Sequence, residues 1–280
     1  MIKFFLIMSA LYLFMICPRL RHRCDMTSFC SKPTCHRGIH NNKTIPENSI
    51  PAFKAAIEAE HGIEFDVQFT KDHQLVVFHD DDLSRMCGIN KKVIDLTYDE
   101  LSEIRLLDTD EKIPTLKEVL DLIDGRVPII IEMKNALSMI RELPCKLYEV
   151  MKDYHGEYSI ESFNPMYVGK YRKFDKTVAR GVLSLKFGKI DGKKHQQVLA
   201  VILENLLMNF IAKPDFIAYR YTDYKKLSFR LNRLLGATTV AWTIPENSDI
   251  HNKVKKYFDA YICDISSSDM LDNLLVERND

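Results

Sequence analysis

The chain contains 280 residues, of which 46% are hydrophobic and 28% are charged. Its 39 lysines and arginines equal its 39 aspartates and glutamates, so no overall positive charge attracts nucleic acid, and nucleic-acid binding is disfavoured. The length slightly exceeds the ~250 residues typical of one eight-stranded α/β barrel, which leaves room for a short N-terminal segment.

Residues 1–18 form a hydrophobic segment with Lys3 before its apolar run and three arginines after it. The run is shorter than the ~20 residues that span a bilayer, and it lacks an A-x-A cleavage site. A cleaved signal, an uncleaved anchor and a buried helix all remain open. We favour an uncleaved anchor, which predicts a membrane-associated protein whose side of the membrane the charges do not define.

Residues 19–33 show no apolar periodicity and are expected to connect this segment to a domain over residues 34–280. Cys24 and Cys30 lie in this connector, and Cys35 follows it. None of the seven cysteines has the C-x-x-C spacing of a zinc or redox site, and a disulfide framework is unexpected in a chain of this size. Free thiols are therefore favoured over a metal site.

Four apolar, strand-like runs end in ionisable side chains, within residues 34–134. The side chains are His36 and Arg37, Glu64 and Asp66, His79, and Glu132 and Lys134. Side chains two apart on a strand share a face, so each carboxylate has a charged neighbour on its own side of the sheet. If these strands are parallel and alternate with helices, their carboxyl ends meet on one rim, where α/β barrels build their active sites.

The elements between these runs are readable from their turns and caps. A helix is predicted from residue 49, ending at Gly62. Residues 70–74 are too few for a helical crossover, so the strands on either side are antiparallel neighbours, or one is a modified barrel element. Two further helices are predicted to begin with capping boxes, Thr97 with Glu100 and Thr115 with Glu118.

Five further strand candidates follow residue 134, and with the earlier four they make nine, one more than a closed barrel needs. They read YSIESF, TVARGVL, FIAYR, TTVAW and AYICD. The sequence does not identify the extra strand. Residues 198–212 are apolar on most faces and are interpreted as a core-facing barrel helix, with a second membrane contact as the alternative.

The motifs, taken together and in this order, resemble the glycerophosphodiester phosphodiesterase family. They are HRG at residues 36–38, PENS at 46–49, EFDV at 64–67, VFHD at 77–80, IPTL at 113–116 and EMK at 132–134. Fainter agreement in ESFNP and AWT extends the resemblance over about residues 34–266. The family is similar in fold to phospholipase-C-like phosphodiesterases, so the resemblance implies a (β/α)8 TIM barrel.

The resemblance also implies roles for individual residues. His36 and His79 match the general acid and base, and Glu64, Asp66 and Glu132 match the ligands of one divalent cation. Arg37, Glu47, Lys134 and Trp242 match groups that bind the substrate or support the site. Two positions depart from the family pattern: Pro245 stands where an asparagine is usual, which weakens the assignment of Trp242, and Cys35 replaces the commoner alanine.

The same assignment follows from what phosphodiester hydrolysis requires. Attack on the anionic diester raises negative charge on its oxygens, so the site needs fixed positive charge, here Arg37 and Lys134. It also needs proton transfer near neutral pH, for which imidazole is suited. Carboxylate oxygens suit Ca²⁺ or Mg²⁺. Other candidates are set aside: His40, His61 and His73 as surface histidines, and Asp80, Asp81 and Asp82 as solvated or helix-capping residues.

The predicted function is metal-dependent hydrolysis of a glycerophosphodiester to glycerol 3-phosphate and an alcohol. A lysophospholipase D or sphingomyelinase D activity on a lipid phosphodiester is the alternative among enzymes. A catalytically silent, membrane-anchored binding protein is the alternative from another class, and two titrating histidines argue against it. The preferred alcohol, the choice of metal, the attacking group (water or a substrate hydroxyl) and the oligomeric state stay open.

Overall fold

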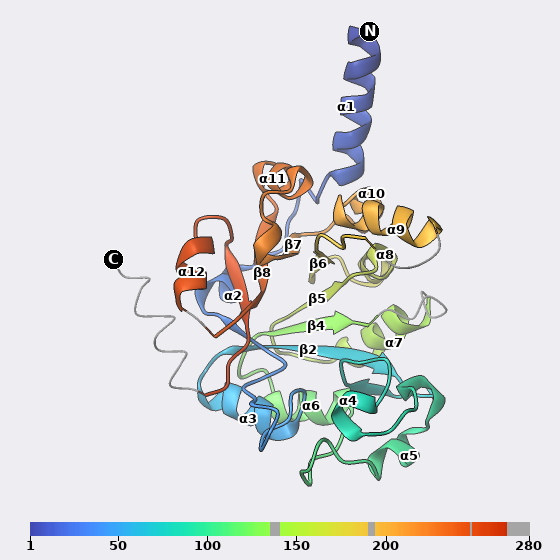
Figure 1. Cartoon of the computed structure of the whole chain (residues 1–280), viewed down its shortest axis with the longest axis vertical. Helices are drawn as coiled ribbons and strands as arrows, with labels where there is room; N and C mark the ends of the chain where they lie inside the picture. Colours follow the sequence, from blue (N-terminus) through green and yellow to red (C-terminus); the bar gives the residue numbers. More distant parts are fainter. Residues whose placement is uncertain (135–140, 190–193, 247, 268–280) are drawn as a thin grey trace.

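A closed barrel forms the body of the protein in the computed structural model, which describes residues 1–134, 141–189, 194–246 and 248–267 (Figure 1). The described residues form a sheet of nine strands: β1 (Thr34–His36), β2 (Gly62–Phe69), β3 (Leu75–Val77), β4 (Ile129–Met133), β5 (Tyr158–Ser162), β6 (Ala179–Ser184), β7 (Phe216–Arg220), β8 (Thr238–Ile244) and β9 (Ala260–Cys263). The strand order is β1-β9-β8-β7-β6-β5-β4-β2-β3, and β1 also pairs with β2. Eight parallel strands therefore close into the predicted TIM barrel.

The extra strand is β3. It pairs antiparallel with β2, with Val67 opposite Val77, because the turn between them is too short for a crossover. β3 therefore lies outside the closed ring and leads into a segment that buries its own apolar cluster, which includes Val76, Leu83 and Ile113. This segment carries VFHD, so His79 reaches the site from an excursion between β2 and β4.

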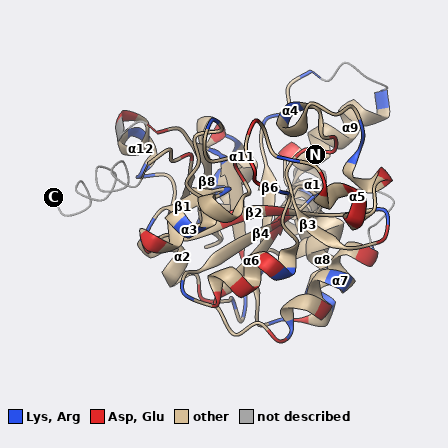
Figure 2. Cartoon of the chain, turned by 90° about the horizontal axis from the view of Figure 1, so that it is seen from below, with Lys and Arg blue, Asp and Glu red and all other residues tan. Residues whose placement is uncertain are grey.

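Helices alternate with the barrel strands and cover their outer face (Figure 1). Among the described residues, the helices after β1 are α3 (Ile50–Glu58), α4 (Ser84–Cys87), η1 (Val93–Asp95), α5 (Tyr98–Ser102), α6 (Leu116–Ile123), α7 (Glu142–Met151), α8 (Pro165–Phe174), α9 (Lys194–Glu204), α10 (Asn209–Ala212), η3 (Tyr221–Asp223), α11 (Leu227–Leu234) and α12 (Ser248–Val254). Basic and acidic residues are interspersed over these helices (Figure 2), in keeping with the balanced composition.

Both predicted capping boxes are confirmed, at Thr97 in front of α5 and at Thr115 in front of α6. The predicted end of α3 is wrong. The helix stops at Glu58, and the left-handed turn that follows is made by Glu60, whose φ is 56°. Gly62 instead begins β2, where an added Cβ would lie 3.2 Å from the carbonyl oxygen of Pro128. The glycine is required by close strand packing and not by a turn.

Residues 198–212 divide between two helices instead of forming one. Leu206 lies between α9 and α10 in a left-handed conformation, with a φ of 56°, and its side chain is buried. The carbonyl oxygens of Leu203 and Glu204 accept hydrogen bonds from Ser184 and Tyr219 of the barrel. The link between the two helices thus packs on β6 and β7. Val198, Leu199 and Val201 of α9 are exposed, however, so the core-facing interpretation does not hold for that part of the stretch.

The N-terminal hydrophobic helix is present as α1 (Ile2–Ile16) and points away from the barrel (Figure 1). Its C-terminal end packs on α10 through Phe14 and Phe210, whose ring centroids are 5.6 Å apart. A helix of 15 residues is about 22 Å long, against a hydrocarbon core of ~30 Å. No helix within the described ranges has the length and apolar character to cross a bilayer. The prediction of a transmembrane anchor, and of a membrane location based on it, is therefore wrong.

The segment before β1 packs against the inside of the barrel. It contains the short helix α2 (Thr27–Ser31), and the buried side chains of Met26 and Phe29 contact an interior cluster that includes Ala179, Phe216 and Ala260. Those three residues begin β6, β7 and β9, so α2 covers the amino-terminal mouth of the barrel. The division into residues 1–18, 19–33 and 34–280 stays a prediction. The packing of α2 shows that residues 19–33 contact the barrel formed by the third range.

An ion-pair network ties the same segment to the barrel. Arg180 on β6 is fully buried, and its Nη2 lies 3.0 Å from Oδ2 of Asp215. The other oxygen of Asp215 accepts a hydrogen bond from Nη1 of Arg19 at 3.1 Å. One buried carboxylate thus neutralises an interior arginine and holds the chain that leads to α2.

Replacing Asp215 with asparagine is expected to destabilise the fold by about 3–5 kcal/mol, because it leaves the buried charge of Arg180 unpaired. Urea unfolding at pH 7 measures the change. Asp121→Asn, which breaks the exposed 2.6 Å pair with Lys117, serves as a control and should cost less than about 1 kcal/mol. Equal effects of the two variants would contradict this account.

Candidate active site

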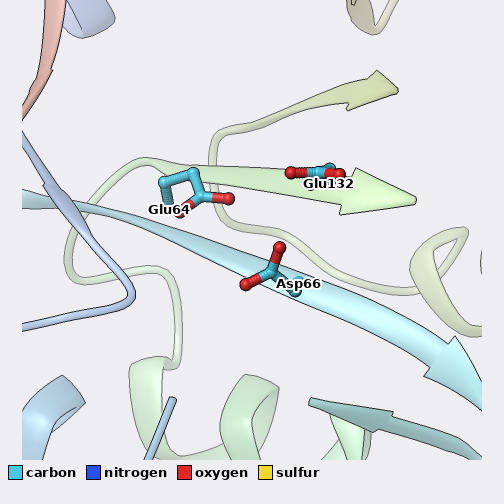
Figure 3. Close-up of side chains that lie close together, drawn as sticks. All are labelled: Glu64, Asp66 and Glu132. Atoms are coloured by element: carbon cyan, nitrogen blue, oxygen red, sulfur yellow. The ribbon is translucent and has the colours of Figure 1, made fainter. Parts of the chain in front are cut away.

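Three buried carboxylates from neighbouring strands gather at one place in the barrel (Figure 3). Glu64 and Asp66 share a face of β2 because they are two residues apart, and Asp66 lies beside Glu132 of β4 in the strand register. One ligand oxygen from each of the three lies within 4.8 Å of the others. The structure therefore brings together the predicted metal ligands.

Two cations lie against this carboxylate triad. Nζ of Lys134 is 3.3 Å from Oδ1 of Asp66 and 3.1 Å from Oε1 of Glu132, and Nε of Arg37 is 3.4 Å from Oδ2 of Asp66. Burial would raise the pKa of Asp66, but Lys134 and Arg37 outweigh burial and hold it well below its usual range. Burial raises the pKa of Glu132 to about 7, and burial with the charge of Asp66 raises that of Glu64 strongly.

Each of the two predicted catalytic histidines pairs through Nδ1 with an aspartate. Nδ1 of His36 is 2.7 Å from Oδ1 of Asp264, and Nδ1 of His79 is 2.6 Å from Oδ1 of Asp80. Burial would raise the pKa of both aspartates, but hydrogen bonds from His36 to Asp264, and from Arg85 and His79 to Asp80, leave both lowered. An ionised carboxylate only accepts, so each Nδ1 carries a proton that it donates to its aspartate.

The two histidines border the carboxylate triad from different sides. His36 on β1 pairs in register with Glu64, and its Nε2 is 3.9 Å from Oε2 of that residue. His79 approaches from the segment after β3, and its protonated form would lower the pKa of Asp66. Burial lowers the pKa of His79, Asp66 opposes this effect, and Lys134 adds to it. His79 is therefore kept in the neutral form that can accept a proton.

The HRG motif owes its residue types to backbone geometry. Arg37 has a φ of 55°, an unusual conformation for a residue with a side chain, and it directs the guanidinium to both Asp66 and Glu47. Gly38 follows with a φ of 83°, and an added Cβ would lie 2.8 Å from the backbone of Ala52 in α3. The strained turn is thus sustained by a glycine and by the ion pairs that Arg37 forms.

Trp242 lies on β8, three strands around the barrel from β2. Its ring packs edge-to-face with Phe163 at a centroid distance of 5.4 Å. Its Nε1 is buried and finds no hydrogen-bond acceptor among the described residues. The other eight predicted site residues cluster around β1, β2 and β4, whereas Trp242 contributes to an aromatic wall on the opposite side.

The model of the glycerophosphoryl diester phosphodiesterase family matches residues 36–266, the span that carries this site. The chain is also 37% identical to a glycerophosphodiester phosphodiesterase of Caldanaerobacter subterraneus over 251 residues, which cover 82% of this chain and 92% of the relative. The chain belongs to the glycerophosphoryl diester phosphodiesterase family. The predicted resemblance and the predicted class of enzyme, a phosphodiesterase, are confirmed.

Two solved structures agree with this phosphodiesterase in fold, and a further relative matches part of its sequence. A glycerophosphodiester phosphodiesterase of Thermotoga maritima is 27% identical with a TM-score of 0.65, and the match covers 88% of this chain and 98% of that one. A phosphodiesterase of Oleispira antarctica, solved in complex with sn-glycerol-3-phosphate, is 21% identical with a TM-score of 0.71 over 89% and 98% of the two chains. A human lysophospholipase D is 33% identical over 154 residues, 50% of this chain and 47% of the relative.

The carboxylate triad of this phosphodiesterase fits a divalent cation. Two oxygens bound to one ion at ~2.1–2.5 Å lie at most ~4–5 Å apart. The ligand oxygens of the three carboxylates lie within 4.8 Å of one another and meet this requirement. The ligands are all hard carboxylate oxygens, the set that Ca²⁺ and Mg²⁺ prefer. Burial, together with the charge of Asp66, raises the pKa of Glu64 and Glu132, and a bound cation would favour the ionised form of both.

Three residues that contact the predicted catalytic groups or their partners were missed or set aside in the sequence. Asp80 had been interpreted as solvated or capping, but it pairs with His79, whereas Asp82 does receive the backbone N–H of Ser84. Asp264 follows β9 directly, and the strand AYICD signalled it as a carboxylate at a strand end. Arg85 donates a hydrogen bond to Asp80, but it belongs to none of the sequence motifs and could not be identified from them.

One further buried carboxylate lies near the site, and two of the three histidines predicted at the surface are not exposed. Glu161 on β5 lies beside Glu132 in register, and burial raises its pKa well above the usual value. His61, predicted at the surface, is buried, and its Nδ1 lies 2.9 Å from the carbonyl oxygen of Pro33. His40 is half-buried, whereas His73 is exposed as predicted.

Glu47 of the PENS motif is a buried anion held by two arginines. Arg37 and Arg85 both donate to it, and burial would raise its pKa, but these bonds and charges lower it far below the usual value. The unfolded chain takes up a proton here near pH 4.5, whereas the folded protein does so only at much lower pH. The stability contributed by Glu47 is therefore present above about pH 4.5 and is lost as pH falls below it.

Glu47→Gln is accordingly expected to lower stability at neutral pH and to flatten its dependence on pH. Between pH 5 and 3 the slope of the unfolding free energy should fall by up to about 1.4 kcal/mol per pH unit, the value for one proton. Urea unfolding across this range measures the slope. Glu60→Gln, at a side chain 84% exposed, is the control and should leave the slope unchanged. An unchanged slope in Glu47→Gln would contradict the assignment.

Proposed function

We propose that this phosphodiesterase hydrolyses a glycerophosphodiester to glycerol 3-phosphate and an alcohol. Its site would use one divalent cation, Ca²⁺ or Mg²⁺, held by Glu64, Asp66 and Glu132. The observation that carries the proposal is the meeting of this carboxylate triad with His36 and His79 on one rim. A binding protein has no need of two imidazoles that are each held by an aspartate through Nδ1.

The chain's own residues supply the proton transfers. One imidazole, in its neutral form, removes a proton from the attacking oxygen through Nε2, and the other, in its imidazolium form, donates its Nε2 proton to the departing alkoxide. Asp264 and Asp80 hold the two rings and stabilise the imidazolium form of each. Such aspartates act by orientation and charge, without themselves becoming protonated.

Positive charge stabilises the phosphate oxygens as negative charge builds on them. The side chain of Lys134 is largely buried, and although burial would lower its pKa, Glu132 and Asp66 raise it, so the amine stays protonated. Arg37 lies beside it across Asp66. A bound divalent cation would add Lewis-acid stabilisation of the phosphoryl oxygens.

The substrate class rests on the relatives. The relative from Caldanaerobacter, which aligns with most of both chains, is named a glycerophosphodiester phosphodiesterase. Hydrolysis of a lysophospholipid is the second candidate, favoured by the human lysophospholipase D, although that match covers half of this chain. The aromatic wall of Trp242 and Phe163 would suit an apolar or cationic alcohol in either case.

Purified full-length protein tests the proposal when it is incubated with glycerophosphocholine in Mg²⁺ or Ca²⁺. Release of glycerol 3-phosphate, followed through its oxidation by a coupling dehydrogenase, is the expected result, and EDTA should abolish it. Lysophosphatidylcholine in a parallel assay should yield less product per unit time. Absence of glycerol 3-phosphate would overturn the proposal, and lysophosphatidic acid as the main product would replace it with the second candidate.

A further inference from the structure

Arg85 joins two parts of the site that the sequence keeps 38 residues apart. It lies on the short helix α4, and its Nε donates to Oδ2 of Asp80 at 2.6 Å. Its Nη1 and Nη2 donate to the two oxygens of Glu47 at 2.9 and 2.7 Å. All three guanidinium nitrogens therefore hold carboxylates, a fork geometry that lysine does not reproduce.

Glu47 is fully engaged at the other end of this connection. One of its oxygens accepts from Arg37 Nη1 at 2.6 Å as well as from Arg85, and the other accepts from Asn42 Nδ2 at 2.8 Å as well as from Arg85. Four donors on two oxygens leave this carboxylate little capacity to bind a further group. Glu47 is thus a fixed point between two arginines.

The Asp80 carboxylate shows the complementary arrangement. Its Oδ1 receives the imidazole of His79, and its Oδ2 receives Arg85. A carboxylate held at one oxygen only can rotate about its Cβ–Cγ bond and carry its partner with it. Held at both oxygens, Asp80 has one orientation, and the His79 ring has one orientation with it.

We propose that Arg85 is a positioning residue for His79, acting through Asp80, and that Glu47 fixes Arg85 in place. The chain of contacts runs from the loop after β1 to the segment after β3, the two places that carry the HRG and VFHD motifs. This inference rests on the proposed phosphodiesterase function. It assigns Glu47 to support of the catalytic groups and not to direct contact with the substrate.

Steady-state kinetics of Arg85→Gln test the proposal. The kcat for glycerophosphocholine should fall about 10–100-fold with KM changed less than about threefold, because the variant misorients a proton-transfer group and leaves phosphate binding intact. Arg85→Lys keeps the charge but cannot bond both carboxylates, so its kcat should lie between those of wild type and Arg85→Gln. Arg105→Gln is the matched control, because Arg105 donates to the backbone oxygen of Ser102, and its kcat should match wild type.

A double-mutant comparison separates positioning from other roles. Since Arg85 acts through Asp80, Asp80→Asn combined with Arg85→Gln should be no slower than Asp80→Asn alone, within about twofold. If the double variant instead shows the product of the two single reductions in kcat, the proposal is overturned. A higher KM with unchanged kcat in Arg85→Gln would also overturn it, because that result would make Arg85 a substrate contact.

The ring of His79 provides a readout that does not depend on turnover. In ¹⁵N-labelled protein, with the signal assigned by its loss in His79→Gln, wild type should show a protonated Nδ1 and an unprotonated Nε2. Arg85→Gln and Arg85→Lys should shift these signals toward a mixture of tautomers while amide spectra stay folded. Unchanged His79 signals would overturn the proposal. A wild type that fails to hydrolyse glycerophosphodiesters but shows these shifts would overturn only the proposed function.

Discussion

Replacing His79 or His36 with alanine is expected to lower kcat for glycerophosphodiester hydrolysis by about 10²–10⁴-fold, the usual contribution of a general acid or base. KM should change little, because Arg37 and Lys134 hold the phosphate in our proposal. Each ring is oriented by an aspartate on Nδ1, Nε2 of His36 lies 3.9 Å from Oε2 of Glu64, and His79 interacts electrostatically with Asp66. Removal of either ring therefore removes a proton-transfer group without removing an expected metal ligand.

The control for these variants is His73→Ala. His73 belongs to the same part of the chain, but its side chain is 52% exposed and lies 3.6 Å from Glu142. The kcat of His73→Ala should equal that of wild type. Calorimetric titration with Mg²⁺ or Ca²⁺ should give the same stoichiometry for wild type, His36→Ala and His79→Ala. Retention of more than a tenth of wild-type kcat would exclude the replaced histidine from proton transfer.

Glu132→Gln is expected to abolish metal binding and activity together, and yet to stabilise the metal-free protein at alkaline pH. Burial raises the pKa of Glu132 to about 7, so the folded state favours its neutral form. The unfolded chain ionises near pH 4.5, and metal-free stability is therefore lost as pH rises from about 4.5 through 7. Glutamine is neutral at every pH, so the variant should not show this loss.

Thermal unfolding of metal-free and metal-loaded protein at pH 5 and pH 8 measures both effects. Divalent cation should raise the Tm of wild type more at pH 8 than at pH 5, because at pH 5 it competes with protons for the carboxylates. It should leave the Tm of Glu132→Gln nearly unchanged. Glu103→Gln, on the exposed surface, is the control and should respond like wild type. Equal metal-induced shifts in Glu132→Gln and wild type would exclude Glu132 as a ligand.

Much of the site was predictable because its residues follow short-range rules. Alternation along β2 placed Glu64 and Asp66 on one face, and parallel pairing placed Glu132 beside them. The capping boxes of α5 and α6 are equally local, since donor and acceptor are three residues apart. Motif order then identified the family, because six short matches in sequence are far more specific than any one of them.

The residues that the sequence left unassigned have partners that depend on tertiary structure. Asp264 meets His36 across 228 residues, and that contact exists only because β9 closes the barrel against β1. Asp80 and Arg85 look like ordinary loop residues until Glu47 is brought beside them. The prediction for α1 failed for a different reason: the apolar composition was given more weight than the shortness of the run, which the structure confirms with a helix of 15 residues that ends at Ile16.

The packing of Met26 and Phe29 under the barrel determines where the folding unit starts. The family match begins at His36, and the first barrel strand begins at Thr34. A fragment trimmed to either boundary would open the apolar floor of the barrel to water and would also leave Asp215 without Arg19. Shortened versions made for crystallisation should therefore keep the chain from Arg19 onward, even though those residues precede every recognisable motif.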